Sequence, residues 1–237
     1  MKRLIVAFGF LTRLPMPRVE ADGDDFAAAI RWYPVVGLAI GGLVAGAGWA
    51  GGQLDPWVGA LAALAVWVAV TGALHLDGLG DLADGLGARH ADRARFLAVM
   101  ADPHIGSFGV VAIVLQLLAK LVLLHAVLPG SAGAVVVIPF AARVGPLAWA
   151  RWLPPLREGL GSAVAKAARR RDVLGWTAVI VGAAVVVPAL AAAPLLIAGW
   201  GWWLKRRVGG VSGDCHGAGI ELVETGLLLA LLVAGRF

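Results

Sequence analysis

Long runs of apolar residues divide this chain into segments that are long enough, or nearly so, to cross a lipid bilayer. A helix needs about twenty apolar residues to span the hydrocarbon core. The stretch 173–204 exceeds one span, and Pro188 and Pro194 bracket a small-residue turn inside it, so we divide it in two. The pattern predicts spans at residues 34–52, 57–76, 107–127, 132–150, 173–188, 192–204 and 217–235. We therefore expect an all-α, polytopic integral membrane helix bundle of about seven transmembrane helices, with six or eight as alternatives.

Basic residues alternate between rich and poor connections along these predicted spans. The connections at 53–56, 128–131 and 189–191 contain no Lys or Arg. On the seven-span topology, 17 of the 20 Lys and Arg residues face one side. Because Lys and Arg are enriched in cytoplasmic connections, this side is expected to be the cytoplasm. No connection is long enough for a soluble domain, so residues 1–237 are expected to form a single membrane-embedded domain.

The composition excludes several classes of protein. With 60% hydrophobic and 15% charged residues and a mean hydropathy of +0.85, the chain is not an ordinary soluble globular protein. The sequence pI of about 10.1 does not indicate nucleic-acid binding, since the basic residues are scattered among short connections. Cys215 is the single cysteine, so no disulfide can form within the chain.

Three aspartates follow the second predicted span. Asp77, Asp81 and Asp84 are spaced i, i+4 and i+7, which places them on one face of a helix. Such a stripe of like charges favours a bound cation, and dense oxygen ligands suit Mg²⁺ or Mn²⁺. Four glycines are interleaved with the stripe and would let a ligand or a neighbouring helix approach the backbone. The alternative interpretation is a solvated helix end.

A second polar motif, MADPHIGSFG, occupies residues 100–109. Its Pro and Gly residues predict a turn between helices. Asp102 could face back toward the aspartate stripe as a further metal ligand or as a base, and His104 is a candidate general base.

A third motif, GDCHGAGIELVE, occupies residues 213–224. Asp214 and His216 precede the last span, where they could contact a phosphate or a sugar. Glu221 and Glu224 lie on one face inside this otherwise apolar span. Carboxylates at that depth usually face a polar cavity, so both are candidates for substrate binding, with polar contacts between helices as the alternative.

Most of the arginines are expected only to set the membrane topology. The candidates for phosphate binding are Arg13, Arg31 and Arg89. Residues 169–171 are expected to contact lipid headgroups. Lys120 and Arg143 lie within predicted spans; Lys120 is expected to snorkel toward the surface, whereas Arg143 is expected inside the bundle. Bound metal and arginines at one membrane face together indicate phosphoryl-type transfer.

Two family resemblances sharpen this interpretation. The pattern of Asp81, Asp84, Gly85, Ala88 and Arg89, followed by Asp102, resembles part of the CDP-alcohol phosphotransferase motif. Two positions depart from that motif: Ala98 stands at a glycine position, and Gly106 stands at the last aspartate position, which is the usual base in that family.

A second resemblance is carried by five motifs: FLTRLPMP at 10–17, RWYPVVG at 31–37, HLDGLGDLADG at 75–85, MADPHIGSFG at 100–109 and GDCHGA at 213–218. With these motifs the chain more closely resembles the adenosylcobinamide-GDP ribazoletransferase, or cobalamin synthase, family. The resemblance implies a multi-pass, Mg²⁺-dependent transferase of the bacterial inner membrane. It implies that α-ribazole, or its 5′-phosphate, is joined to adenosylcobinamide-GDP with release of GMP. The product is adenosylcobalamin or its 5′-phosphate, which completes the nucleotide loop in cobalamin biosynthesis.

On this basis we expect a catalytic domain with its active face toward the cytoplasm. The predicted ligands of Mg²⁺, with Mn²⁺ as an alternative ion, are Asp77, Asp81, Asp84 and Asp102, and the metal would hold the pyrophosphate. The candidates for accepting the hydroxyl proton are Asp102, His104 and His75. Contact with membrane lipid is expected, and a homo-oligomer is compatible with the sequence. The alternatives are another membrane phosphotransferase of the CDP-alcohol type and a secondary transporter.

Overall fold

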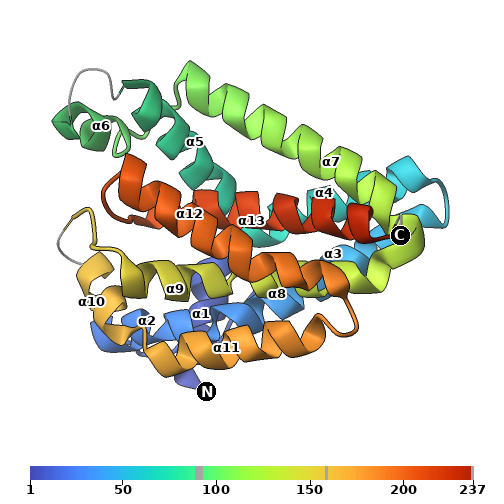
Figure 1. Ribbon diagram of the computed structural model, residues 1–237, viewed down its shortest axis with the longest axis horizontal. Coiled ribbons are helices and arrows are strands. Elements are labelled where there is room, and N and C mark those ends of the chain that lie inside the picture. The colour runs from blue at the N-terminus through green and yellow to red at the C-terminus, as the bar shows by residue number, and fades with distance from the viewer. Residues whose placement is uncertain (89–92, 158–159, 236–237) are drawn as a thin grey trace.

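The computed structural model describes residues 1–88, 93–157 and 160–235, and it is built from helices throughout these ranges (Figure 1). An isolated bridge between Pro155 and Val211 is the exception within this described part. The elements are α1 Lys2–Leu11, α2 Gly23–Ala29, η1 Ile30–Trp32, α3 Tyr33–Gly52, α4 Pro56–Thr71, α5 Leu74–Ala88, α6 Arg93–Val99, α7 Ser107–Val135, α8 Val137–Ala142, α9 Val144–Trp152, α10 Leu160–Ala167, α11 Arg170–Ala183, η2 Pro188–Ala192, α12 Ala193–Arg207 and α13 Gly213–Ala234. This confirms the predicted all-α class.

Helix α13 runs through the middle of the bundle and packs against α5, α7, α8 and α12 (Figure 1). Its buried face carries glycine and alanine at several positions, which allows close packing of the neighbouring helices. Helix α7 differs, because much of its surface is apolar and exposed, including Phe108, Leu115 and Leu118. Such a surface is suited to contact with lipid.

Three helical segments in the described part of the chain are long and apolar enough to cross a membrane: Gly23–Gly52, Ser107–Val135 and Gly213–Ala234. They confirm the spans expected at 34–52, 107–127 and 217–235. A fourth crossing is possible if α4 and α5, which bend by 83° at a short break, count together as one broken span. The chain is therefore a membrane protein.

The predicted count of seven spans is not confirmed. Residues 132–150 do not form one helix, since they divide among the end of α7, α8 and α9. The divisions inside this segment fall at Val136 and Arg143, and a further kink precedes it at Ser131, where φ is −145°. Helices α11 and α12 contain 14 and 15 residues, which is shorter than the bilayer core requires.

The sharp bend between α4 and α5 sets the position of the aspartate stripe. Gly72 and Ala73 both adopt left-handed backbone conformations, with φ of +59° and +58°. This reversal ends α4 and starts α5 in a new direction.

Helices α6 and α10 lie at one end of the bundle, whereas the α3–α4 turn, the α11–α12 turn and the C-terminal end of α13 lie at the other (Figure 1).

Candidate active site

The aspartate stripe lies on α5 as the spacing predicts. Asp77 is exposed, Asp81 is half-buried and Asp84 is buried. The charges of Asp77, Asp214 and Asp84 all repel the Asp81 carboxylate. We call these four residues the acidic cluster. Asp214 was expected to bind substrate, and the structure brings it beside the stripe.

The close approach of α5 and α13 explains how Asp214 reaches the stripe. A Cβ atom on Gly78 would lie 2.8 Å from the Asp214 Cα atom, so only glycine fits between the two helices there. Asp214 lies in the first turn of α13, and Ser212 caps that helix by accepting from the Cys215 amide at 3.2 Å. The Ser212 hydroxyl also donates to Asp214 Oδ2 at 3.2 Å.

Asp84 connects α5 to the start of α7. Its carboxylate accepts hydrogen bonds from the backbone amides of Gly106 and Gly109, at 2.7 and 2.9 Å. These amides belong to the first turn of α7, where backbone N–H groups have no partner within the helix. Asp84 therefore caps a helix that is distant in the sequence.

A cavity of about 350 Å³ lies at the Asp77 end of the stripe, among α1, α2, α5, α9, α10 and α13. Its apolar walls include Phe10, Phe26, Tyr33 and Ile220. Its polar lining includes His75, Asp77, Asp214 and His216. An apolar chamber with a few polar groups is typical of a small-molecule site. We call it the central cavity.

The two histidines of the central cavity have different surroundings. His216 stacks on Trp149, with ring centroids 5.9 Å apart, and its Nδ1 has no hydrogen-bond partner among the described residues. His75 is 3% exposed, and its Nδ1 lies 3.4 Å from Nη2 of Arg143, while its Nε2 also has no hydrogen-bond partner in the described part of the chain. Each histidine therefore has one buried ring nitrogen whose hydrogen bonding the described residues do not satisfy.

Glu221 and Glu224 do not line the central cavity. Lys120 Nζ lies 2.7 Å from Glu221 and 2.6 Å from Glu224, and Arg143 Nη1 donates to Glu224 at 2.7 Å. All four side chains are buried, and we call them the ion-pair cluster. Both glutamates therefore make polar contacts between helices, which is the alternative to substrate binding that the sequence left open. It also corrects the expectation for Lys120, which is 2% exposed and does not snorkel.

Asp102 and His104 lie at the opposite end of the stripe, in a pocket of about 290 Å³ that Asp84 also lines. Asp102 Oδ1 accepts from the His104 amide at 3.0 Å and lies 2.8 Å from His104 Nδ1. The hydrogen bond from the His104 amide and the contact with its ring hold the pKa of the Asp102 carboxyl below its ordinary value. Asp102 is therefore an anion that orients His104.

The three predicted phosphate arginines do not gather at one place. Arg31 donates to the Ala167 carbonyl at 2.7 and 2.9 Å and pairs with Asp172 at 3.3 Å, away from the central cavity. Arg13 is exposed, and its side chain lies over Gly72 at the α4–α5 bend. Arg89 lies outside the described residues.

Within residues 1–88, 93–157 and 160–235, no three His, Cys, Asp or Glu side chains are close enough to hold a metal ion by themselves. The four predicted ligands extend along α5 to the turn before α7, with Asp77 at the central cavity and Asp102 at the far pocket. The metal site remains a prediction.

Sequence reasoning missed the aromatic lining of the central cavity. Phe10 and Phe26 are in edge-to-face contact at 5.0 Å, and Phe10 also stacks on Tyr33 at 6.1 Å. Phe10 and Tyr33 belong to two of the quoted motifs, at 10–17 and 31–37, so those motifs carried the only signal.

Comparisons with known proteins agree with the motifs. The family model described as cobalamin-5-phosphate synthase matches residues 3–232. The adenosylcobinamide-GDP ribazoletransferase of Novosphingobium aromaticivorans is 58% identical over 240 residues, covering 99% of this chain and 98% of that protein. Proteins of the same name are 53% identical in Laribacter hongkongensis, covering 100% and 98% of the two chains, and 46% identical in Thiobacillus denitrificans, covering 99% and 95%. No solved structure matches the chain.

Proposed function

The chain belongs to the cobalamin-5-phosphate synthase family, and we propose that it joins adenosylcobinamide-GDP to α-ribazole, or to its 5′-phosphate, releasing GMP. The observation that carries this proposal is the central cavity, whose aromatic walls open beside a line of carboxylates. The cavity matches the two parts of α-ribazole, a flat apolar base and a polar ribose. We place the active face toward the cytoplasm, at the inner membrane.

The two substrates would occupy different parts of this site. A cavity of about 350 Å³ suits the α-ribazole base, whereas adenosylcobinamide-GDP is far larger and must lie mostly outside it. We assign its pyrophosphate to the outer part of the stripe, near Asp81 and Asp84. The acceptor hydroxyl then forms a bond to the phosphorus that bears cobinamide, and the bond between the two phosphates breaks to release GMP.

Mg²⁺ would be needed because carboxylates otherwise repel a pyrophosphate. Mg²⁺ is commonly bound through one or two carboxylates together with substrate phosphates, and not by an all-protein cage. The crowded negative charges around Asp81 fit this mode. The residues that would hold the ion are Asp77, Asp81, Asp84 and Asp102. When bound, it would neutralise phosphate charge during the transfer.

We assign different roles to the two candidate histidines. A guanidinium can only donate hydrogen bonds, so the neighbouring Arg143 makes Nδ1 of His75 an acceptor and leaves the hydrogen on Nε2. His75 then donates to substrate and does not take the proton. In His104, Nδ1 donates to Asp102, which leaves the Nε2 lone pair free to accept the hydroxyl proton. This role requires the ribose of α-ribazole to extend from the central cavity along the stripe toward the Asp84 end, where His104 lies.

The deciding experiment is release of GMP from adenosylcobinamide-GDP and α-ribazole by the protein in lipid vesicles, with and without Mg²⁺. We expect activity only with a divalent cation, and loss of at least about a hundredfold in Asp81→Asn. The exposed Asp24 gives the matched control, since Asp24→Asn changes the same chemical group away from the cavity. Full activity in Asp81→Asn, with intact protein in the membrane, would refute the assignment.

A further inference from the structure

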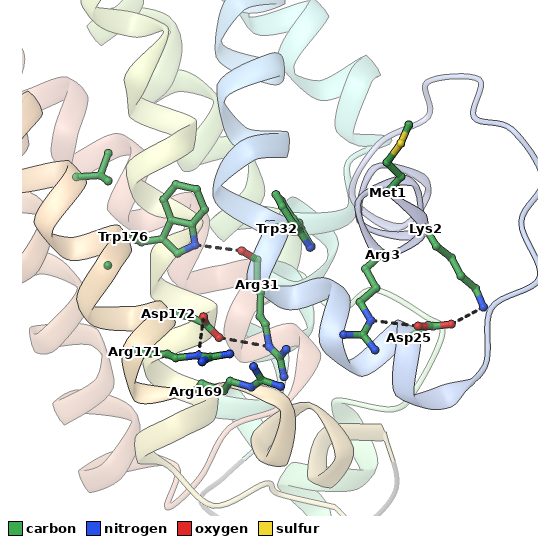
Figure 2. A pocket seen from close by; sticks show the side chains of 12 residues that line it. Met1, Lys2, Arg3, Asp25, Arg31, Trp32, Arg169, Arg171, Asp172 and Trp176 are labelled. Atoms are coloured by element: carbon green, nitrogen blue, oxygen red, sulfur yellow. Dashed lines mark hydrogen bonds and ion pairs between the residues drawn. The ribbon is translucent and has the colours of Figure 1, made fainter.

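A second cavity, of about 700 Å³, lies between the N-terminal segment and α11 (Figure 2). It shares no lining residue with the central cavity within the described chain. Five basic residues line it: Lys2, Arg3, Arg31, Arg169 and Arg171. We call it the basic pocket.

The acidic residues of the basic pocket do not balance its positive charge. Asp25 pairs with Lys2 at 2.5 Å and with Arg3 at 3.1 Å. Asp172 pairs with Arg31 at 3.3 Å and lies 3.9 Å from Arg171. Among the described lining residues, two carboxylates thus face five cationic side chains.

The remaining positive charge is concentrated at the start of α11. Arg169 is the N-cap residue of this helix, and Arg170 and Arg171 follow directly. The partial positive charge at a helix N-terminus disfavours cations, and Asp172 in the first turn of α11 offsets only part of the charge of three successive arginines. Arg169 and Arg171 repel Arg31, whereas Asp172 attracts it. The cations that Asp172 and Asp25 leave unbalanced favour a bound anion.

The other wall of the pocket is apolar. Figure 2 shows the indole rings of Trp32 and Trp176 on the side away from Arg169 and Arg171. Trp32 is 39% exposed, and Val179 on α11 is 49% exposed. Tryptophan beside exposed aliphatic side chains is typical of the zone where a membrane protein meets headgroups and acyl chains.

We propose that the basic pocket binds the phosphate headgroup of an anionic phospholipid, with Arg169 and Arg171 as the principal ligands and Trp32 and Val179 against the acyl chains. A soluble phosphate would use the cationic wall alone. The apolar wall and its exposed continuation along α11 favour the lipid.

The test measures lipid binding to the full-length protein in detergent by native mass spectrometry. Phosphatidylglycerol and phosphatidylcholine with the same acyl chains are compared. Two arginines near a membrane surface each contribute about a factor of five, so we expect about 25-fold weaker phosphatidylglycerol binding in Arg169→Gln/Arg171→Gln. The control Arg206→Gln/Arg207→Gln removes two exposed arginines at the end of α12 and should bind as the wild type does.

Two further arms keep the proposal falsifiable if the glutamine variant does not fold. Arg169→Lys/Arg171→Lys keeps the charge and should retain most of the binding. In the wild type, glycerol 3-phosphate should not displace the lipid. Equal binding of the two lipids by the wild type, equal loss in the α12 control, or displacement by glycerol 3-phosphate at the lipid's own concentration would each overturn the proposal.

Discussion

Nη2 of Arg143 lies 3.4 Å from Nδ1 of His75, and this contact joins the central cavity to the ion-pair cluster. Arg143 is fully buried, and its Nη1 donates to Glu224 at 2.7 Å and to the Pro139 carbonyl at 3.0 Å. Two hydrogen bonds from Nη1 therefore hold the guanidinium in place, while Nη2 contacts the histidine. A cluster of charges inside the bundle thus sets the hydrogen-bonding direction of a residue in the candidate active site.

The first prediction concerns the balance of the ion-pair cluster. Lys120→Met leaves two buried carboxylates with only Arg143 as a charged partner, so the free energy of unfolding should fall by about 3–5 kcal/mol. Adding Glu221→Gln leaves one negative charge, on Glu224, opposite one positive charge, on Arg143. The double variant should therefore recover most of the lost free energy of unfolding. Chemical denaturation of both variants in detergent measures the difference. A double variant no more stable than the single one would contradict this account.

The second prediction separates donation from proton acceptance at His75. The side-chain amide of glutamine places an N–H donor near the position of Nε2, whereas phenylalanine has no polar group there. If His75 donates to substrate, His75→Gln should keep at least about a tenth of the wild-type kcat, and His75→Phe should lose about a hundredfold. Rates of GMP release under saturating substrate decide between them. Equal loss in both variants would contradict the donor role of His75.

The third prediction concerns His104, whose side chain is 90% exposed. His104→Ala should lower kcat by about 10²–10⁴-fold, because the hydroxyl proton then has no positioned acceptor. Free imidazole in the buffer can reach so open a site and should restore part of the rate. Thermal unfolding should be unchanged, which separates this loss from misfolding. An unchanged kcat in His104→Ala would show that His104 is not the proton acceptor.

The sequence predicted the aspartate stripe better than it predicted the spans. A spacing of i, i+4 and i+7 depends only on helix geometry, so Asp77, Asp81 and Asp84 fall where the pattern places them. The span expected at 132–150 is not confirmed, because hydropathy does not predict that the segment divides among the end of α7, α8 and α9. Burial of Lys120 depends on partners about 100 residues away, at Glu221 and Glu224, which no local pattern reveals.

The lining of the central cavity also could not be predicted from local sequence patterns. Its lining comes from helices as distant in sequence as α1 and α13, and an aromatic residue such as Phe10 resembles any other residue of an apolar stretch. Only the quoted family motifs connected these positions. Periodicity predicts the face of a helix, whereas the partner of that face depends on tertiary packing.

The last prediction distinguishes two neighbouring aspartates of the stripe. Asp84 accepts two backbone hydrogen bonds at the start of α7, so Asp84→Ala should lower the free energy of unfolding by about 2 kcal/mol as well as activity. Asp81 experiences repulsion from three other carboxylates, so Asp81→Ala should remove activity while leaving stability unchanged or slightly raised. Paired measurements of thermal unfolding and GMP release on both variants test this contrast. If the two variants lost stability equally, the helix-capping role of Asp84 would have to be abandoned.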